Sequence, residues 1–161
     1  MTVPKPDRWW PEGTNVARAR VLERIIDDVI VHGHRPCILL AEDDPEMLAL
    51  VASALRRPGM LVIECRDGCE LMDAFAAALR APFSFDFPDL IVADDRMPGW
   101  CGLEVLASLR RAGHRVPFIL MSAFADDDTR ASALRLGAAD VRVKPFDLDD
   151  LVASVDRILR A

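Results

Sequence analysis

Three apolar runs of this sequence each end in charged residues that could carry out chemistry together. The first run ends in an acidic triplet, the second in two aspartates and the third in a lysine. These residues are Glu42, Asp43, Asp44, Asp94, Asp95 and Lys144. Mg²⁺ prefers oxygen ligands, and it commonly uses one or two carboxylates together with water and phosphate. An aspartate can also become phosphorylated, and a lysine ammonium suits a phosphate oxygen. These residue types therefore indicate a divalent cation beside a phosphoryl group.

The sequence positions these residues by alternating apolar strands with amphipathic helices. Strands are expected at residues 37–42, 60–65, 89–94, 117–122 and 139–143. Helices are expected at residues 45–57, 68–80, 102–112, 127–136 and 147–160. Strands that are almost wholly apolar and alternate with helices indicate a parallel sheet covered on both faces. Ligands of such sheets bind beyond the carboxyl ends of the strands, so the charged residues are expected to converge there.

The order and spacing of these motifs resemble the receiver domain of two-component response regulators, of the stand-alone, chemotaxis type. The resemblance covers roughly residues 36–160. Its marks are the acidic group 42–44, the stretch 89–99, the pair Ser122-Ala123 and the triplet Lys144-Pro145-Phe146. It implies an α/β, flavodoxin-like, doubly wound (βα)5 fold with a five-stranded parallel sheet in the order 2-1-3-4-5. Residues 1–35 would then be an N-terminal extension, and residues 36–161 would be the receiver.

The resemblance also implies roles for individual residues. Asp94 would accept a phosphoryl group from a sensor histidine kinase or a phosphotransfer protein. Ser122 and Lys144 would contact the phosphoryl oxygens, and the Lys144-Pro145 peptide bond would be cis. The implied ligands of Mg²⁺, the expected cofactor, are Glu42, Asp43, Asp94 and the backbone carbonyl of Arg96. The expected function is a phosphorylation-dependent switch that alters protein–protein contacts.

Three positions bear on how such a switch would work. Val141 stands where receivers usually carry Tyr or Phe, so the usual inward swing of an aromatic ring is not expected. The backbone around residues 122–124 and helix 127–136 would carry the switch instead. Arg96 and Phe124 flank the site and predict slow autodephosphorylation, because bulk beside the phosphate impedes the in-line water. In the alternative, Arg96 points to solvent and Phe124 covers the core.

Composition and charge argue against several classes of protein. The 161 residues have a formal net charge of −6, and 52% of them are hydrophobic. Residues 1–35 carry six Lys/Arg and five Asp/Glu, against fourteen and twenty-one in the remainder. An acidic domain without a basic stripe is a poor candidate for nucleic-acid binding. No run approaches the roughly 18 apolar residues of a membrane span, and the N-terminus lacks a secretion signal, so a cytoplasmic protein is expected.

The cysteines and histidines offer only weak metal motifs. Cys65 and Cys69 lack a matching second pair, and His32, His34 and Cys37 lack a further ligand nearby. Free thiols in a reducing compartment are therefore expected.

The N-terminal extension is expected to contain an amphipathic helix at residues 15–31, because its apolar residues recur at helical spacing. This helix could pack on its own receiver, form a homodimer or dock to another protein. Trp9 and Trp10 could anchor any of these contacts. The face formed by residues 127–160 is a second candidate for a homodimer contact.

Two other functions are open for the same residues. A pseudo-receiver would keep the fold and act as a phosphorylation-independent protein-binding or dimerisation module. A phosphatase with an aspartyl nucleophile would need an acid Asp two residues after Asp94, where this sequence has Arg96. No enzyme activity is expected beyond self-phosphorylation and autodephosphorylation. No output domain is expected either, because the sequence ends with helix 147–160.

Overall fold

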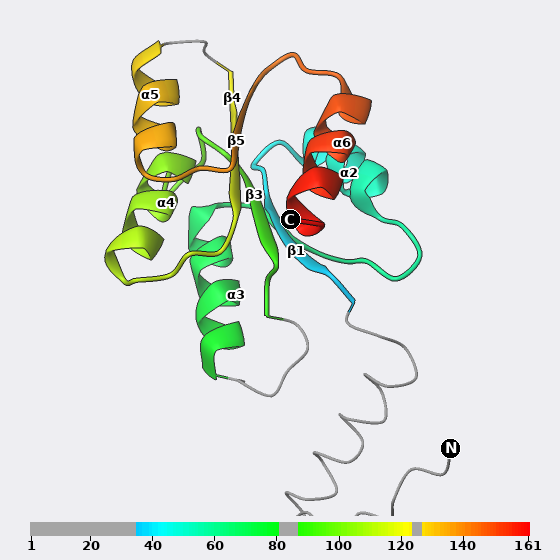
Figure 1. Cartoon of the computed structure of the whole chain (residues 1–161), viewed down its shortest axis with the longest axis horizontal. Helices are drawn as coiled ribbons and strands as arrows, with labels where there is room; N and C mark the ends of the chain where they lie inside the picture. Colours follow the sequence, from blue (N-terminus) through cyan, green and yellow to red (C-terminus); the bar gives the residue numbers. More distant parts are fainter. Residues whose placement is uncertain (1–34, 81–86, 124–126) are drawn as a thin grey trace, which may run out of the picture. The chain divides into compact units, whose positions relative to one another are not determined.

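Five parallel strands form one sheet at the centre of the described part of the chain (Figure 1). The computed structural model describes residues 35–80, 87–123 and 127–161. The strand order is β2-β1-β3-β4-β5, which confirms the predicted doubly wound, flavodoxin-like sheet. The strands are β1 (Cys37–Ala41), β2 (Leu61–Cys65), β3 (Leu90–Asp94), β4 (Phe118–Ser122) and β5 (Asp140–Val143).

Helices alternate with these strands and cover both faces of the sheet. Figure 1 shows α2 and α6 on one face and α3, α4 and α5 on the other. The helices are α2 (Pro45–Leu55), α3 (Gly68–Arg80), α4 (Gly102–Arg111), α5 (Asp127–Arg135) and α6 (Leu148–Leu159). No helix in the described ranges is both long and apolar enough to cross a membrane.

The two faces of the sheet bury separate apolar clusters, since successive strand residues point to opposite sides. In β1, Leu39 packs with the cluster under α3 and α4, whereas Ile38 and Leu40 pack with α2 and α6. Every residue of β1, β3 and β4 is buried, while β2 and β5 are buried only in part. This difference follows from their positions, because β2 and β5 are the edge strands.

The predicted element boundaries agree with the structure to within one or two residues. The end of α2 differs most, because it was predicted at residue 57 and lies at Leu55, with Arg56 extended at φ −70° and ψ 114°. Proline disfavours the helical conformation at the residue before it. Arg57 precedes Pro58, so the helix ends ahead of the proline rather than at it.

Some predictions fall outside the described residues. These are the helix at 15–31 with Trp9 and Trp10, and the ring of Phe124 beside the site.

Candidate functional site

The carboxyl ends of four strands bring five predicted site residues to one edge of the sheet. Glu42 and Asp43 directly follow β1, and Asp94 is the last residue of β3. Ser122 is the last residue of β4, and Lys144 follows β5. Strands β1, β3, β4 and β5 are consecutive neighbours, and parallel strands end at the same edge. The predicted convergence is thus what the fold produces.

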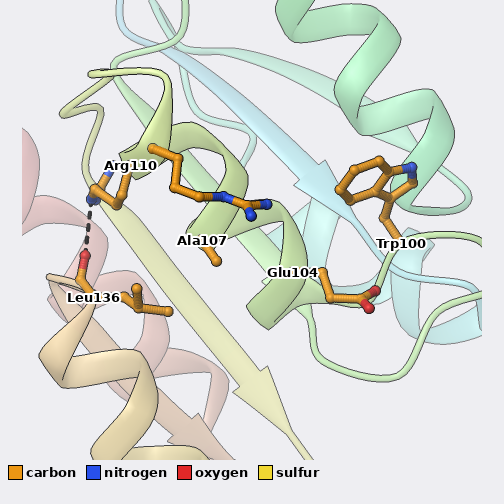
Figure 2. A pocket seen from close by; sticks show the side chains of 6 residues that line it. Trp100, Glu104, Ala107, Arg110 and Leu136 are labelled. Carbon is orange, nitrogen blue, oxygen red and sulfur yellow. Dashed lines mark hydrogen bonds between the residues drawn. The ribbon is translucent and has the colours of Figure 1, made fainter.

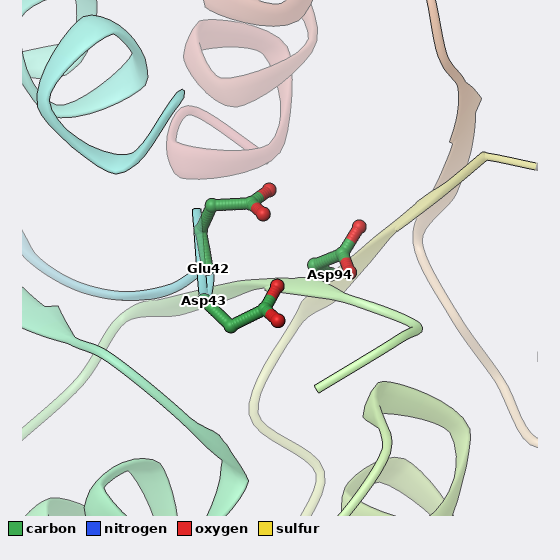
Figure 3. Close-up of side chains that lie close together, drawn as sticks. All are labelled: Glu42, Asp43 and Asp94. Carbon is green, nitrogen blue, oxygen red and sulfur yellow. The ribbon is translucent and has the colours of Figure 1, made fainter. Parts of the chain in front are cut away.

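Three carboxylates face one another at this edge (Figure 3). Oxygen atoms from Glu42, Asp43 and Asp94 all lie within 4.8 Å of one another. Glu42 is 2% exposed and Asp94 is 4% exposed, whereas Asp43 is exposed. Like charges this close repel unless a cation lies between them. Three hard oxygen donors, one of them open to solvent, fit a divalent cation such as Mg²⁺.

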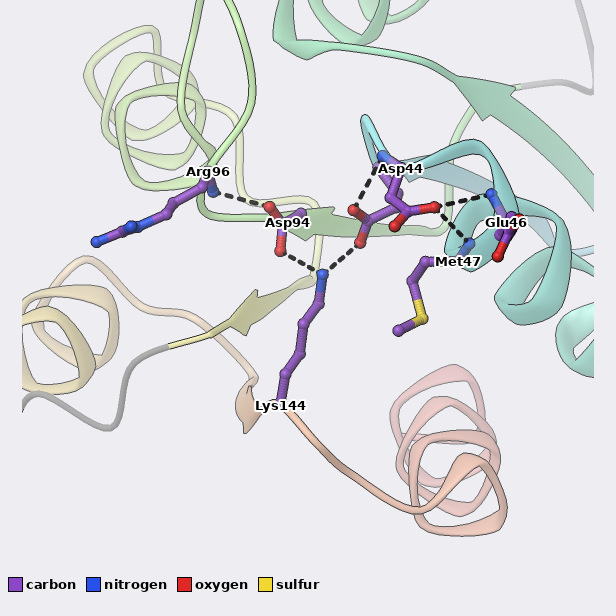
Figure 4. A network of polar contacts seen from close by, with 7 residues as sticks. Asp44, Glu46, Met47, Asp94, Arg96 and Lys144 are labelled. Atoms are coloured by element: carbon purple, nitrogen blue, oxygen red, sulfur yellow. Dashed lines mark hydrogen bonds and ion pairs between the residues drawn. The ribbon is translucent and has the colours of Figure 1, made fainter.

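Lys144 bridges two of these carboxylates (Figure 4). Its Nζ donates a hydrogen bond to Glu42 Oε2 at 2.6 Å and lies 2.8 Å from Asp94 Oδ1. The lysine side chain is 19% exposed, so solvent screens these ion pairs less than it would screen surface pairs. The cluster contains three carboxylates and one ammonium that contacts two of them, which leaves a surplus of negative charge.

Burial and pairing set the ionisation of Glu42 and Lys144. Burial raises the pKa of Glu42, and the hydrogen bond from Lys144 opposes this rise only in part. Burial alone would lower the pKa of Lys144, but its hydrogen bonds to Asp94 and Glu42 outweigh burial and raise that pKa. Lys144 therefore keeps its positive charge throughout the neutral range.

Backbone N–H groups fix the orientation of the two buried carboxylates. The N–H of Arg96 donates to Asp94 Oδ2 at 2.9 Å, and the N–H of Asp44 donates to Glu42 Oε1 at 3.3 Å. Each carboxylate thus has one oxygen held by the backbone and the other by Lys144. These contacts fix the positions of both carboxylates.

Two charged neighbours of the site make other contacts. Asp44 caps α2, because its Oδ1 accepts the N–H groups of Glu46 and Met47 at 2.9 and 3.1 Å (Figure 4). Arg96 is exposed, and its side chain leads away from Asp94 in Figure 4. Of the two orientations considered for Arg96, the structure therefore shows the one toward solvent. The metal-ligand role of its backbone carbonyl stays a prediction.

Ser122 and Lys144 are linked through the backbone. The N–H of Lys144 donates to the Ser122 carbonyl at 2.7 Å, and the Lys144-Pro145 bond is cis, as predicted. The register of β3 and β4 pairs Asp94 with Met121, so Ser122 lies one residue beyond on the neighbouring strand. Ser122 is 4% exposed, which places it inside the same buried edge as Asp94.

Two glycines allow close backbone contacts with Asp94 and with the loop that follows it, and neither glycine was predicted to lie at the site. A Cβ on Gly102 would lie 2.5 Å from the backbone oxygen of Asp94. A Cβ on Gly68 would lie 1.9 Å from the backbone oxygen of Trp100. A signal was available in the sequence, because each glycine lies in the first turn of a helix. Glycine has a low helix propensity, so its presence there suggests a close contact that a side chain would prevent.

Val141 is 5% exposed and belongs to the core cluster that includes Leu109 and Ala133. At this position of β5 the structure thus has a small, buried side chain, and no aromatic ring is available there to move between inward and outward positions.

The cysteines of the described part are free. Burial raises the pKa of Cys65 to about 12, which makes this thiol unreactive. Within the described ranges, the carboxylate cluster is the one group that assembles three potential metal ligands. His32 and His34 lie outside those ranges.

The family of the response regulator receiver domain matches residues 38–156. The chain is 32% identical over 125 residues to the DNA-binding transcriptional regulator NtrC of Escherichia coli, covering 78% of this chain and 25% of that protein. It is 38% identical over 125 residues to the transcriptional regulatory protein PrrA of Mycobacterium tuberculosis, covering 78% of this chain and 50% of that protein. The chain thus spans a quarter to a half of the length of these two relatives.

Solved structures give the same assignment. The Francisella response regulator 1452 receiver domain superposes with a TM-score of 0.68 at 26% identity, covering 78% of this chain and 97% of that one. The non-phosphorylated HemR receiver domain from Leptospira biflexa also gives a TM-score of 0.68, at 25% identity, covering 78% of this chain and 95% of that one. With the carboxylates and Lys144 gathered at the carboxyl edge of a sheet of this order, the chain belongs to the response regulator receiver domain family.

Proposed function

We propose that this protein is a phosphorylation-dependent signalling switch in which Asp94 accepts a phosphoryl group. The observation that carries the proposal is the placement of Asp94 at the end of β3. Its carboxylate lies 2.8 Å from the Lys144 ammonium and within 4.8 Å of oxygens from Glu42 and Asp43. Membership in the receiver family supports a sensor histidine kinase or a phosphotransfer protein as the donor.

The transfer is a displacement at phosphorus. A carboxylate oxygen of Asp94 bonds to the phosphorus of a phosphohistidine while the bond from phosphorus to the imidazole nitrogen breaks. The electron pair of that bond remains on the imidazole nitrogen, and Asp94 becomes an acyl phosphate. Such transfers depend on positioning and on electrostatic stabilisation of the phosphoryl oxygens. Lys144 is placed to exchange a carboxylate oxygen for a phosphoryl oxygen, and Ser122 lies on the next strand.

Glu42, Asp43 and Asp94, with the backbone carbonyl of Arg96, would hold Mg²⁺. When bound, the cation offsets the negative charge of the carboxylates and of the phosphoryl oxygens. The chain's own contribution is preorganisation, because backbone N–H groups and Lys144 already orient Glu42 and Asp94.

Phosphorylation would act on protein contacts in the cytoplasm. Val141 is small and buried, so β5 has no ring there to exchange between inward and outward positions. We expect the switch to run through the backbone at Ser122 and through α5. The backbone chemical shifts of residues 137–147 should therefore change less on phosphorylation than those around Asp94. Equal changes in a two-dimensional ¹H–¹⁵N NMR comparison would contradict this mechanism.

The direct test is treatment with acetyl phosphate and Mg²⁺, followed by measurement of the intact mass. Wild type should gain one phosphate, and Asp94→Asn should gain none. Asp95→Asn is the matched control, since Asp95 adjoins Asp94 but directs its Oδ1 toward the N–H of Leu103 at 3.3 Å. An adduct that persists in Asp94→Asn would show that another residue is modified.

A pseudo-receiver is the second candidate, and the buried Val141 is the observation that favours it. Such a module would bind partners without using phosphate. It would give no mass adduct with acetyl phosphate and no stabilisation by Mg²⁺. An adduct confined to chains that retain Asp94 would exclude it.

A further inference from the structure

A groove on the α4 side of the sheet contains none of the residues of the phosphorylation site. Its volume is about 480 Å³. Figure 2 shows the residues that line it, which come from the loop before α4, from α4 itself and from the residue that follows α5. These residues are Trp100, Glu104, Ala107, Arg110, Arg111 and Leu136.

The apolar part of the groove is centred on a tryptophan. Trp100 is 39% exposed, although burying an indole removes a large apolar area from water. Its backbone is fixed by close contact with Gly68, where no side chain would fit. Ala107 and Leu136 continue the apolar surface along the groove. A tryptophan with an exposed side chain and a well-fixed backbone is typical of the residues that contribute most to binding at protein interfaces.

The other side of the groove carries positive charge. The guanidinium of Arg110 donates hydrogen bonds to backbone carbonyls. Burial lowers the pKa of Arg110, and the positive charge of the nearby Arg115 lowers it further. Among the described residues, Arg110, Arg111 and Arg115 have no carboxylate partner. These arginines contrast with the chain as a whole, whose formal net charge is −6.

The one carboxylate in the groove is used elsewhere. Glu104 accepts the N–H of Cys101 at 3.0 Å as part of the cap of α4. Its charge therefore lies at the positive end of a helix rather than on the arginines. The arginine side of the groove thus remains open to a negatively charged partner.

We propose that this groove docks an acidic segment of another protein that also carries a large apolar side chain. The apolar side chain would contact Trp100, and an acidic side chain would face Arg111. A small-molecule ligand suits the groove less, because such sites bury most of their ligand, whereas Glu104 and Arg111 are exposed. A nucleic acid suits it less because Glu104 lines the same surface.

The test is a selection of random displayed peptides on the full 161-residue chain, without any phosphoryl donor. Enriched peptides should combine Asp or Glu with an aromatic or a large aliphatic residue. A synthetic peptide of that sequence should bind about tenfold more weakly to Trp100→Ala and to Arg111→Glu, which corresponds to about 1.4 kcal/mol each. Binding should also weaken as salt concentration rises.

Two matched controls lie on the opposite face of the sheet. Leu50→Ala removes an exposed apolar side chain from α2, and Arg160→Glu reverses an exposed charge beside the end of α6. Both variants should bind the peptide as wild type does. Thermal melts of all four variants would exclude unfolding as the cause of a loss.

Several outcomes would overturn the proposal. These are the absence of enriched peptides, enrichment of neutral or basic sequences, and binding that Trp100→Ala and Arg111→Glu leave unchanged. A dimer in light scattering that Trp100→Ala dissociates would place a second copy of the chain in the groove instead. Because the selection uses unphosphorylated protein, its result does not depend on whether Asp94 accepts phosphate.

Discussion

A positively charged side chain lies at each end of strands β4 and β5, and the two side chains bind different kinds of groups. At the carboxyl ends, Lys144 contacts the carboxylates of Glu42 and Asp94. At the amino ends, Arg110 donates four hydrogen bonds of 2.9 to 3.1 Å to backbone carbonyls. The acceptors are the carbonyls of His114, Val116, Leu136 and Gly137.

One end of these strands stabilises the fold, and the other end is where it can change. The carbonyls that Arg110 binds are neutral and fixed in the chain, so these bonds tie α4 to the segments that enter β4 and β5. The carboxylates around Lys144 carry more negative charge than one ammonium neutralises. Proteins commonly accept such local conflicts at functional sites. The amino ends therefore act as a clamp, and the carboxyl ends remain able to accept a cation and a phosphoryl group.

The largest effect is expected at the carboxyl ends. Lys144→Met should slow phosphorylation by acetyl phosphate about 100-fold, because the variant removes a preorganised charge beside Asp94. Rates of mass-adduct formation would measure the change. Arg142→Met, which removes a β5 cation paired with Asp140, is the control. A rate for Lys144→Met within threefold of wild type would mean that the lysine is structural only.

The amino-end clamp should show itself in stability. Arg110→Met should lower the free energy of unfolding by about 2 kcal/mol, since four hydrogen bonds from a charged donor are lost and water replaces part of them. The matched variant Arg111→Met changes an exposed neighbour and should stay within about 0.5 kcal/mol of wild type. Urea titrations would measure both. Equal losses of unfolding free energy in Arg110→Met and Arg111→Met would show that the hydrogen bonds of Arg110 do not stabilise the fold specifically.

Stabilisation by Mg²⁺ should depend on residues at the carboxyl ends of the strands and not on Arg110 at the amino ends. At a concentration ten times its dissociation constant, Mg²⁺ should stabilise wild type by about 1.4 kcal/mol. Asp43→Asn, which removes the exposed carboxylate of the cluster, should lose much of this gain. Arg110→Met should keep it, because the clamp lies at the other end of the strands. Thermal melts with and without Mg²⁺ test this prediction, and an equal gain in Asp43→Asn would contradict the assigned ligands.

The smallest effect is expected in the dependence of stability on pH. The pKa of Glu42 is raised above its ordinary value of 4.5, chiefly by burial. Its contribution to stability is therefore fully present below pH 4.5 and is lost as pH rises through the higher, folded-state pKa. Glu42→Gln cannot ionise and should not show this loss. Urea titrations of both proteins from pH 4 to 7, in the absence of Mg²⁺, would show parallel curves if Glu42 were not responsible.

Much of the fold could be predicted because its signals are local. Apolar runs of strand length alternate with amphipathic helices, and Pro45 and Gly137 mark a helix start and a turn that the structure contains. The predicted end of α2 was two residues too late, because Pro58 disfavours the helical conformation at the residue before it as well as ending the helix at its own position. The glycines at positions 68 and 102 were also missed as site residues, because a glycine in the first turn of a helix does not show which distant backbone comes close to it.

The site residues could be named from sequence because each one follows or ends a strand. In a parallel sheet, residues that end neighbouring strands must meet, so Glu42, Asp94 and Lys144 come together once the topology is given. The contacts between these residues, in contrast, could not be predicted from the sequence. Lys144 contacts both buried carboxylates because β1, β3 and the chain after β5 converge at this edge, and no spacing along the chain specifies those distances.

The elements that form and the charges at their ends follow from the sequence, because periodicity and strand-end position are properties of neighbouring residues. Arg110 and Arg111 are adjacent and chemically identical, and their different contacts come from the tertiary structure. A helix turns about 100° between successive residues, so Arg110 reaches the carbonyls before β4 and β5 while Arg111 remains exposed. The groove arises in the same way, since Trp100, α4 and Leu136 come to line one surface only when the helices pack on the sheet.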